Sequence, residues 1–237
     1  MIELEKLRLT GDSIGDWYRN IVSLRQSVSL MDSLADDEDE AHVLVEFEME
    51  HKPYQRVPPI IERDFEMAEI WGLVTEAINY PFEHPNRSRF SDGSYGVWYG
   101  AETLETSIYE TAHHYRENVL AAAHAQKESV VETKRMVMLV RCGSHLLDLR
   151  SHLATTPNLV HPTDYTCCQH TGRDVAHEGH PGLLNHSARR EGGQVATVFQ
   201  AQALSDPRNH CYLTYKLDVA GRQVTVEREP GQTYLTL

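Results

Sequence analysis

Hydrophobic residues recur at helical spacing in two stretches of the first third of the chain. From Asp12 to Leu34, apolar side chains three and four positions apart predict an amphipathic helix that opens at Asp12 or Ser13. A second stripe runs from Ile60 to Tyr80. It predicts a helix that ends before Pro81, because the residue before a proline avoids the helical conformation. Both stripes need an apolar surface to pack against.

A third helical stripe follows a turn-rich segment near the middle of the chain. Residues Arg87 to Gly100 combine glycines, serines and aromatic residues, a composition typical of a turn that opens into a short strand. Thr103 then stands where a helix cap is expected. The apolar side of the predicted helix consists of Leu104, Ile108, Ala112 and Tyr115. Glu110 lies inside this helix.

The other patterns predict strands and one short helix. His42 to Glu50 alternates apolar and acidic residues, as a half-exposed strand does, although a helix also fits. Gly143 separates two strand-like runs that we expect to form a hairpin-like or consecutive pair, and Gly221 with Arg222 predicts a hairpin turn. A short helix is predicted near Thr163 to Ala176. The runs typical of strands are Met136–Arg141, Leu146–Leu149, Val195–Gln200, Tyr212–Leu217 and Val224–Glu227.

These elements place the chain in the α+β class, with a strand-rich second half and flanking helices. A chain of 237 residues is long enough for one domain with a hydrophobic core and an additional segment. We expect residues 1–84 to form an N-terminal extension, made of helices and the alternating strand, that packs on a catalytic domain of residues 85–237.

Charge and composition narrow the function classes. The chain has 22 basic and 35 acidic residues and a formal net charge of −13, which argues against nonspecific binding to nucleic acid or to an anionic membrane. Its apolar runs are too short to cross a bilayer, and the first residues lack the features of a signal peptide, so a cytoplasmic location is expected. The four cysteines do not form a disulfide framework and are expected to be reduced.

Three residue types in the central segment suggest a binding site. Arg89 offers a planar, permanently charged fork for phosphate or carboxylate oxygens, Tyr99 a flat face and a hydroxyl, and Glu110 a carboxylate. Together they suit an anionic ligand that contains a ring. The alternative is structural: Arg89 and Glu110 would pair on the surface, and Tyr95, Trp98 and Tyr99 would belong to the core.

The spacing of these residues is that of a known family. Arg89-Phe-Ser-Asp-Gly-Ser-Tyr-Gly-Val-Trp-Tyr99 is followed by Glu102-Thr-Leu-Glu-Thr-Ser-Ile-Tyr-Glu110, which gives separations of 99 − 89 = 10 and 110 − 99 = 11 residues. The two segments resemble the signature of RES-domain proteins, toxins of bacterial toxin–antitoxin pairs that are named for an Arg, a Glu and a Ser.

The family's serine belongs to a later segment. Leu183-Leu-Asn-His-Ser187-Ala-Arg189-Arg-Glu-Gly-Gly matches the family pattern of a small hydrophobic residue, Ser, any residue, Arg and then Gly. The closing strand pattern, Cys211 to Asp218, is also similar. The resemblance spans Pro85 to Val226 and leaves the N-terminal third uncovered.

The resemblance implies a fold similar to that of ADP-ribosyltransferases, with a mixed or antiparallel sheet core, flanking helices and, here, an N-terminal helical extension. It implies NAD as substrate and cleavage of the nicotinamide N-glycosidic bond, by hydrolysis or phosphorolysis. It also implies a helical Xre-type antitoxin protein as the partner that covers the active site. A homo-oligomer and a toxin–antitoxin hetero-oligomer are both compatible with the sequence.

Within this resemblance, the expected catalytic residues are Arg89, Tyr99, Glu110 and Ser187. Glu110 would bond a ribose hydroxyl and stabilise the positive charge that develops as the glycosidic bond opens. Ser187 would orient the ligand. The expected NAD-binding residues are Arg89 at a phosphate or ribose oxygen, Tyr99 or Tyr95 at the nicotinamide ring, and Ser91, Ser187 and Arg189.

Several other functional hypotheses involve the same residues or other candidate residues. A mono-ADP-ribosyltransferase that modifies a protein target would use the same site, and an inactive interaction module would leave it idle. Ser187 does not lie in the G-x-S-x-G turn of serine hydrolases. The loop residues Cys167, Cys168, His170, His177, His180 and His186 lack metal-site spacing, so no metal is predicted. His113, three residues after Glu110, is expected to face solvent.

Overall fold

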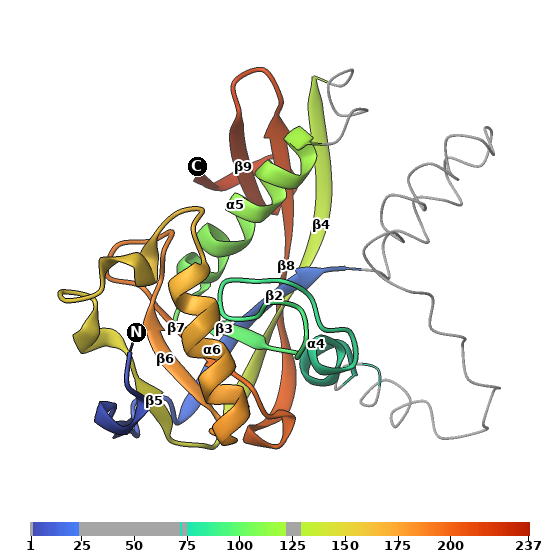
Figure 1. Ribbon diagram of the computed structural model, residues 1–237. Helices are drawn as coiled ribbons and strands as arrows, with labels where there is room; N and C mark the ends of the chain where they lie inside the picture. Colours follow the sequence, from blue (N-terminus) through green and yellow to red (C-terminus); the bar gives the residue numbers. More distant parts are fainter. Residues whose placement is uncertain (1, 24–71, 73–74, 122–128) are drawn as a thin grey trace, which may run out of the picture.

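The computed structural model describes residues 2–23, 72, 75–121 and 129–237 (Figure 1). Within these residues, ten strands form one sheet in the order β1-β5-β6-β7-β3-β2-β4-β8-β9-β10. The described strands pair antiparallel, except that β5 and β6 are parallel. The strands are β1 (Leu9–Thr10), β2 (Gly15–Val22), β3 (Trp98–Ala101), β4 (Val130–Cys142), β5 (Leu146–Asp148), β6 (Gly182–His186), β7 (Gln194–Val198), β8 (Leu204–Asp218), β9 (Gln223–Glu229) and β10 (Gln232–Thr236).

Helices flank this sheet. The α-helices of the described residues are α4 (Tyr80–Glu83), which follows a π-helical turn η2 (Thr75–Asn79), α5 (Leu104–Ala121) and α6 (Thr166–Glu178). Short 3₁₀ turns are η1 (Leu4–Lys6), η4 (Arg150–His152), η5 (Pro157–Val160) and η6 (Ala201–Ala203). The mixed sheet with separate helices confirms the predicted α+β class. None of the helices in the described ranges combines the length and apolar character needed to cross a bilayer.

The two faces of the sheet carry different helices. Met136 belongs to the buried cluster that includes η2, whereas its neighbour Val137 belongs to the cluster beneath α5. Leu184 likewise faces the first cluster, and Leu183 packs in the cluster that contains α6. Because successive strand residues point to opposite faces, α5 and α6 cover one face and η2 with α4 covers the other.

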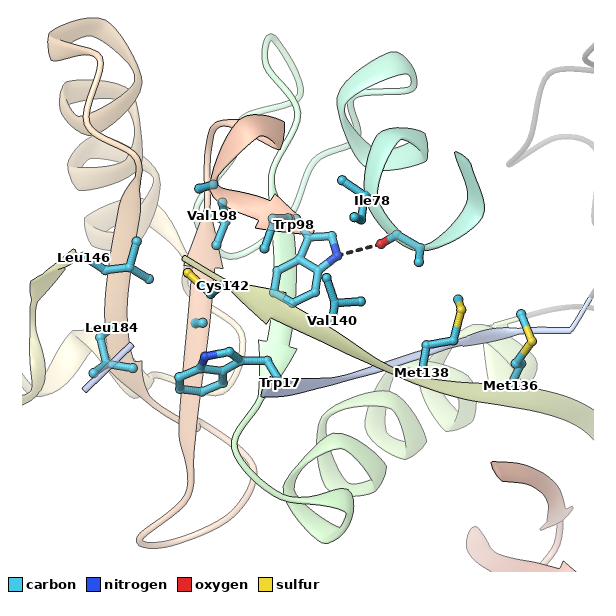
Figure 2. Packing of buried hydrophobic residues seen from close by; sticks show 14 residues of the cluster. Trp17, Ile78, Trp98, Met136, Met138, Val140, Cys142, Leu146, Leu184 and Val198 are labelled. Atoms are coloured by element: carbon cyan, nitrogen blue, oxygen red, sulfur yellow. Dashed lines mark hydrogen bonds between the residues drawn. The ribbon is translucent and has the colours of Figure 1, made fainter. Parts of the chain in front are cut away.

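Two tryptophans fill the centre of the η2 side (Figure 2). Trp98 of β3 is fully buried, and Trp17 of β2 is buried beside it in the same cluster. The Trp98 indole N–H donates a hydrogen bond of 2.7 Å to the carbonyl oxygen of Ala77, which satisfies its single polar atom. This packing fixes β3, the strand that follows the Arg89 loop, against β2 and η2.

The helix predicted from Asp12 to Leu34 is wrong where it is described, because residues 15–22 form strand β2. β2 lies between β3 and β4 and is packed on both faces, with Trp17 on one side and Tyr18 on the other. A strand covered on both faces loses the alternation that distinguishes it from a helix. Its aromatic and β-branched residues favour the strand.

The position of β2 also bears on the predicted division at residue 84. β2 pairs with β4 along its whole length, from Gly15 opposite Cys142 to Val22 opposite Arg135. β1 pairs with β5 at the other end of the sheet order. The described N-terminal residues are therefore part of the same sheet as residues 85–237 and do not form a separate layer on it.

Two local predictions need correction. The helix expected to end before Pro81 instead includes it, because α4 carries this proline in its first turn, where the missing N–H is harmless. The runs on either side of Gly143 do not form a hairpin, since β4 pairs with β2 and β8 while β5 pairs with β1 and β6. The predicted strand His42–Glu50 and the stripe between residues 60 and 71 lie outside the described residues.

Other predictions are confirmed. The Thr103 hydroxyl oxygen accepts the N–H of Thr106 at 3.1 Å and caps the start of α5. The turn at Gly221 and Arg222 joins β8 to β9 as a hairpin, with Arg222 in the left-handed region at φ 55°. The short predicted helix corresponds to α6. The five predicted strand runs correspond to parts of β4, β5, β7, β8 and β9, and the short strand expected after the Arg89 turn is β3. β1, β6 and β10 were not predicted as strands.

Candidate active site

Glu110 reaches the candidate site from the polar side of α5. The apolar residues Leu104, Ile108 and Ala112 hold the helix on the sheet. Glu110 lies on a neighbouring side of the helix, where residues three and four positions apart share one face. That face lines a pocket with Ser107, Glu110, Thr111 and His114.

The Glu110 carboxylate is fixed by the loop after β6. The Ser187 hydroxyl donates a hydrogen bond of 2.5 Å to Glu110 Oε1, and the Ala188 N–H donates to the same oxygen at 3.2 Å. Ser187 Oγ in turn accepts the N–H groups of Arg189 and Arg190 at 3.1 and 3.0 Å. Ser187 does not itself line the pocket. Because its only proton is given to Glu110, it orients the carboxylate and not the ligand, for which the sequence predicts it. Within the described residues Oε2 makes no hydrogen bond.

Arg89 lies in the loop before β3 and is held by the segment between η5 and α6. Its guanidinium donates to the carbonyl oxygens of His161 at 2.8 Å and Leu159 at 3.4 Å. The same group lies 4.5 Å from the centre of the Tyr165 ring, within the range of a cation–π contact. Arg89 forms no ion pair with Glu110 in the described structure, so the predicted alternative of a surface pair does not occur.

Tyr99 lines the pocket with its side chain tied back into the Arg89 loop. Its phenol oxygen lies 2.8 Å from the Ser88 hydroxyl and accepts the Phe90 N–H at 3.0 Å. Burial raises the pKa of Tyr99 far above its usual value, so the phenol stays protonated. Tyr99 thereby fixes the loop that carries Arg89.

These side chains surround a pocket of about 440 Å³, a volume typical of small-molecule sites. It lies on the α5 and α6 side of the sheet, over β2 and β3. Arg89, Tyr99 and Glu110 all line it, as the sequence predicted. The pocket is lined by Tyr18, Arg19, Asn20, Arg87, Ser88, Arg89, Tyr99, Gly100, Ala101, Ser107, Glu110, Thr111, His114, Tyr165, Asn185, Ala188 and Val195.

A directed chain of hydrogen bonds supports the pocket floor. Buried Arg135 donates to Asn20 Oδ1 at 2.6 Å and to the Asn20 carbonyl at 3.0 Å. The Asn20 amide donates to the Tyr215 hydroxyl at 2.9 Å, which lies 2.9 Å from the Thr111 hydroxyl. Thr111 donates onward to the Ser107 carbonyl at 2.7 Å. The chain leaves Asn20 and Thr111 with fixed orientations beside Glu110.

The buried Arg135 and the partly buried Arg19 give this region positive charge. Arg19 donates to the Tyr99 carbonyl at 3.1 Å, and its Nε is buried without a partner among the described residues. Burial, reinforced by the charge of Arg135, lowers the pKa of Arg19 to about 10, which leaves it charged at neutral pH. Neither arginine forms an ion pair within the described residues. A buried cation without a counter-ion favours an anionic ligand nearby.

Ser91 and Tyr95 were predicted to bind NAD, but neither lines the pocket. The fully buried Ser91 hydroxyl donates to the Tyr95 carbonyl at 2.6 Å and accepts the Gly93 N–H at 3.0 Å. The Tyr95 hydroxyl donates to the Phe90 carbonyl at 2.9 Å, and burial raises its pKa to about 12. We assign both residues to shaping the loop, because their polar groups are used inside it.

Arg189, the other predicted binding residue, points toward the segment that holds Arg89. Its guanidinium donates to the Pro162 carbonyl at 2.7 Å and to the Tyr165 hydroxyl at 3.0 Å. It does not line the pocket, although its backbone N–H supports Ser187. The prediction that Arg189 contacts the ligand is therefore not supported, because its guanidinium binds the Pro162 carbonyl and the Tyr165 hydroxyl instead.

Sequence reasoning missed several pocket residues. His114 lines the pocket, whereas the residue singled out in the sequence, His113, does not. The i+4 spacing from Glu110 was a usable signal for His114. Tyr165 and Asn20 carried no such signal, since one lies in an irregular loop and the other in a strand mistaken for a helix. No group of three or more His, Cys, Asp or Glu residues in the described ranges is arranged to hold a metal ion.

Comparison with known proteins agrees with the motif. The family profile described as the RES domain matches residues 32–218. No curated protein matches the chain. A solved structure, the M. tuberculosis MbcT–MbcA toxin–antitoxin complex, matches with 15% identity and a TM-score of 0.38, over 57% of this chain and 74% of that chain. Since the family profile covers well over half of the sequence, the chain belongs to the RES domain family.

Proposed function

We propose that this protein cleaves the nicotinamide N-glycosidic bond of NAD and acts as the toxin of a toxin–antitoxin pair. One observation carries the proposal. Glu110 is fixed through one oxygen by Ser187 and Ala188, while its other oxygen has no hydrogen-bond partner among the described residues and belongs to a pocket that three arginines also line. A fixed carboxylate among cations suits a substrate with a phosphate end and a reacting centre that becomes positive.

In this proposal Arg89 and Arg87 at the pocket wall attract the phosphates of NAD. The charges of the buried Arg135 and the partly buried Arg19 strengthen that attraction, because the surrounding protein screens them less than water would. The overall charge of −13 makes this local positive field necessary for binding an anion. Tyr99 supplies an aromatic wall for the flat nicotinamide ring.

The chemical step breaks the bond between ribose C1′ and the nicotinamide nitrogen. The bonding electron pair leaves with nicotinamide, which becomes neutral, and the ribose gains oxocarbenium character. Glu110 Oε2 accepts a hydrogen bond from a ribose hydroxyl and stabilises the developing positive charge. An acceptor oxygen then bonds to C1′ and loses its proton to solvent. Water as acceptor gives ADP-ribose, and phosphate gives its 1″-phosphate.

The toxin role rests on membership of the RES family, for which depletion of NAD would be the means of toxicity. The expected partner is an Xre-type antitoxin that covers the pocket. The toxin role is tested by expression in cells: the chain alone should lower cellular NAD and arrest growth, whereas co-expression with a cognate antitoxin should prevent both effects. Growth arrest at unchanged NAD would contradict the proposed means.

The enzymatic proposal is tested by incubating the purified chain with NAD, with and without inorganic phosphate, and separating the products. Nicotinamide with ADP-ribose supports hydrolysis, and a requirement for phosphate supports phosphorolysis. NAD labelled in its adenylate part separates the alternative of protein ADP-ribosylation, since the label would then remain on a protein. If nicotinamide is not released in any of these conditions, the proposal is refuted.

A further inference from the structure

Tyr165 contacts two arginines, Arg89 through its ring and Arg189 through its hydroxyl. The guanidinium carbon of Arg89 lies over the ring, 4.5 Å from its centre. Its hydroxyl accepts a hydrogen bond of 3.0 Å from Arg189, whose backbone N–H supports Ser187 at 3.1 Å. The side chain itself lines the pocket. A continuous set of contacts thus runs from Arg89 through Tyr165 and Arg189 to Ser187.

The segment around Tyr165 is anchored well enough to serve as a support. The His161 ring nitrogen Nδ1 accepts the N–H groups of Thr163 and Asp164 at 3.3 and 2.8 Å, and the Asp164 carboxylate accepts the Thr166 N–H at 2.9 Å. Carbonyl oxygens of this segment bind both arginines, His161 O at Arg89 and Pro162 O at Arg189. The loop is therefore organised by its own hydrogen bonds before a ligand binds.

α6 holds this segment close to the Arg89 loop. Gln169 of α6 donates to the carbonyl oxygens of Ser88 and Ser91 at 2.9 and 3.1 Å. Gly172 permits the approach, because a Cβ at this position would lie 2.0 Å from the Phe90 carbonyl oxygen. The helix start that follows Tyr165 is thus locked onto the loop that carries Arg89.

We propose that Tyr165 is a positioning residue for the reaction: its ring fixes the direction of Arg89 at the anionic part of the substrate. The expected effects on KM and kcat rest on the proposed function. The orientation of the Arg89 side chain does not depend on it, because that orientation is a property of the protein without ligand.

Two substitutions separate the ring from the hydroxyl. Tyr165→Phe keeps the aromatic face under Arg89 and removes the bond from Arg189. Tyr165→Leu removes both. The same two changes at Tyr212, an exposed tyrosine of β8 outside the pocket, are the matched controls. Melting temperatures of all variants show whether a change reflects loss of folding.

The readouts are nicotinamide release with KM and kcat, binding of ADP-ribose by calorimetry, and the Arg89 Nε–H resonance by NMR. Tyr165→Leu should raise KM and weaken ADP-ribose binding about tenfold at an unchanged melting temperature. Tyr165→Phe should stay within about threefold of the wild type for both quantities. The Arg89 Nε–H resonance should keep its aromatic ring-current shift in Tyr165→Phe and lose it in Tyr165→Leu.

The outcomes distinguish this inference from the proposed function. Equal effects of the two Tyr165 substitutions on KM, or an unchanged Arg89 resonance in Tyr165→Leu, would overturn the role of the ring. If the wild type releases no nicotinamide, the proposed function fails, and the NMR comparison alone still decides whether Tyr165 positions Arg89. Equal losses at Tyr212 would show a general effect of tyrosine removal and would also refute it.

Discussion

Glu110→Gln is the substitution that most sharply tests the chemistry. It replaces the carboxylate by a neutral amide of nearly the same shape. The amide oxygen can still accept hydrogen bonds from Ser187 and Ala188, which now hold Glu110 at 2.5 and 3.2 Å. The position of the side chain should therefore persist, and only its charge is lost.

The expected loss follows from the charge that develops in the substrate. A carboxylate about 4 Å from a unit positive charge, in surroundings with an effective dielectric constant of about 20, contributes about 4 kcal/mol. Each 1.36 kcal/mol corresponds to about a tenfold change in rate, so kcat should fall about 10²- to 10³-fold. KM should change less than about threefold, because in the ground state the positive charge lies on the nicotinamide ring and reaches the ribose beside the carboxylate only as the bond breaks.

The assay is the initial rate of nicotinamide release over a range of NAD concentrations, combined with thermal unfolding. Glu117→Gln is the control, since Glu117 lies on the same helix, is exposed and does not line the pocket. It should leave kcat unchanged. A Glu110→Gln variant that folds normally and retains kcat within about threefold would refute the role of this carboxylate.

Three further substitutions test the rest of the site. Ser187→Ala removes the 2.5 Å donor to Glu110 and should lower kcat about tenfold with little change in KM, both measured by nicotinamide release; a change in KM alone would contradict an orienting role. Arg89→Ala should weaken calorimetric ADP-ribose binding about 10- to 100-fold, and unchanged affinity would exclude Arg89 from the anion site. Tyr215→Phe leaves the Asn20 amide and the Thr111 hydroxyl without their shared partner and should lower the free energy of unfolding in urea by about 1–3 kcal/mol; no loss would show that the hydrogen-bond chain is not needed.

The sequence was most informative where local signals and spacing agreed. Thr103 predicted the start of α5, and the positions of Arg89, Tyr99 and Glu110 along a loop, strand and helix predicted their meeting in one pocket. These relations depend on residues close in sequence. Ser187 could be placed near them only through the family resemblance, because no local pattern links it to Glu110.

What the sequence could not provide is set by tertiary contacts. β2 was mistaken for a helix because both of its faces are buried, so Asn20 and Arg19 were not recognised as residues beside the site. The pairing of the β4 and β5 strands depends on partners far along the chain and not on the turn at Gly143. Tyr165 acts through contacts with Arg89 and Arg189 that no spacing rule connects.

The measurement that tests the central claim most directly is a proton NMR time course of NAD mixed with the purified chain alone. The account predicts that the signals of NAD decline while those of free nicotinamide rise in equal amount, with phosphate added if phosphorolysis is the route. The Glu110→Gln protein, in the same buffer, should leave NAD intact over the same period. If NAD persists with the wild-type protein in both the presence and the absence of phosphate, the proposed cleavage is contradicted.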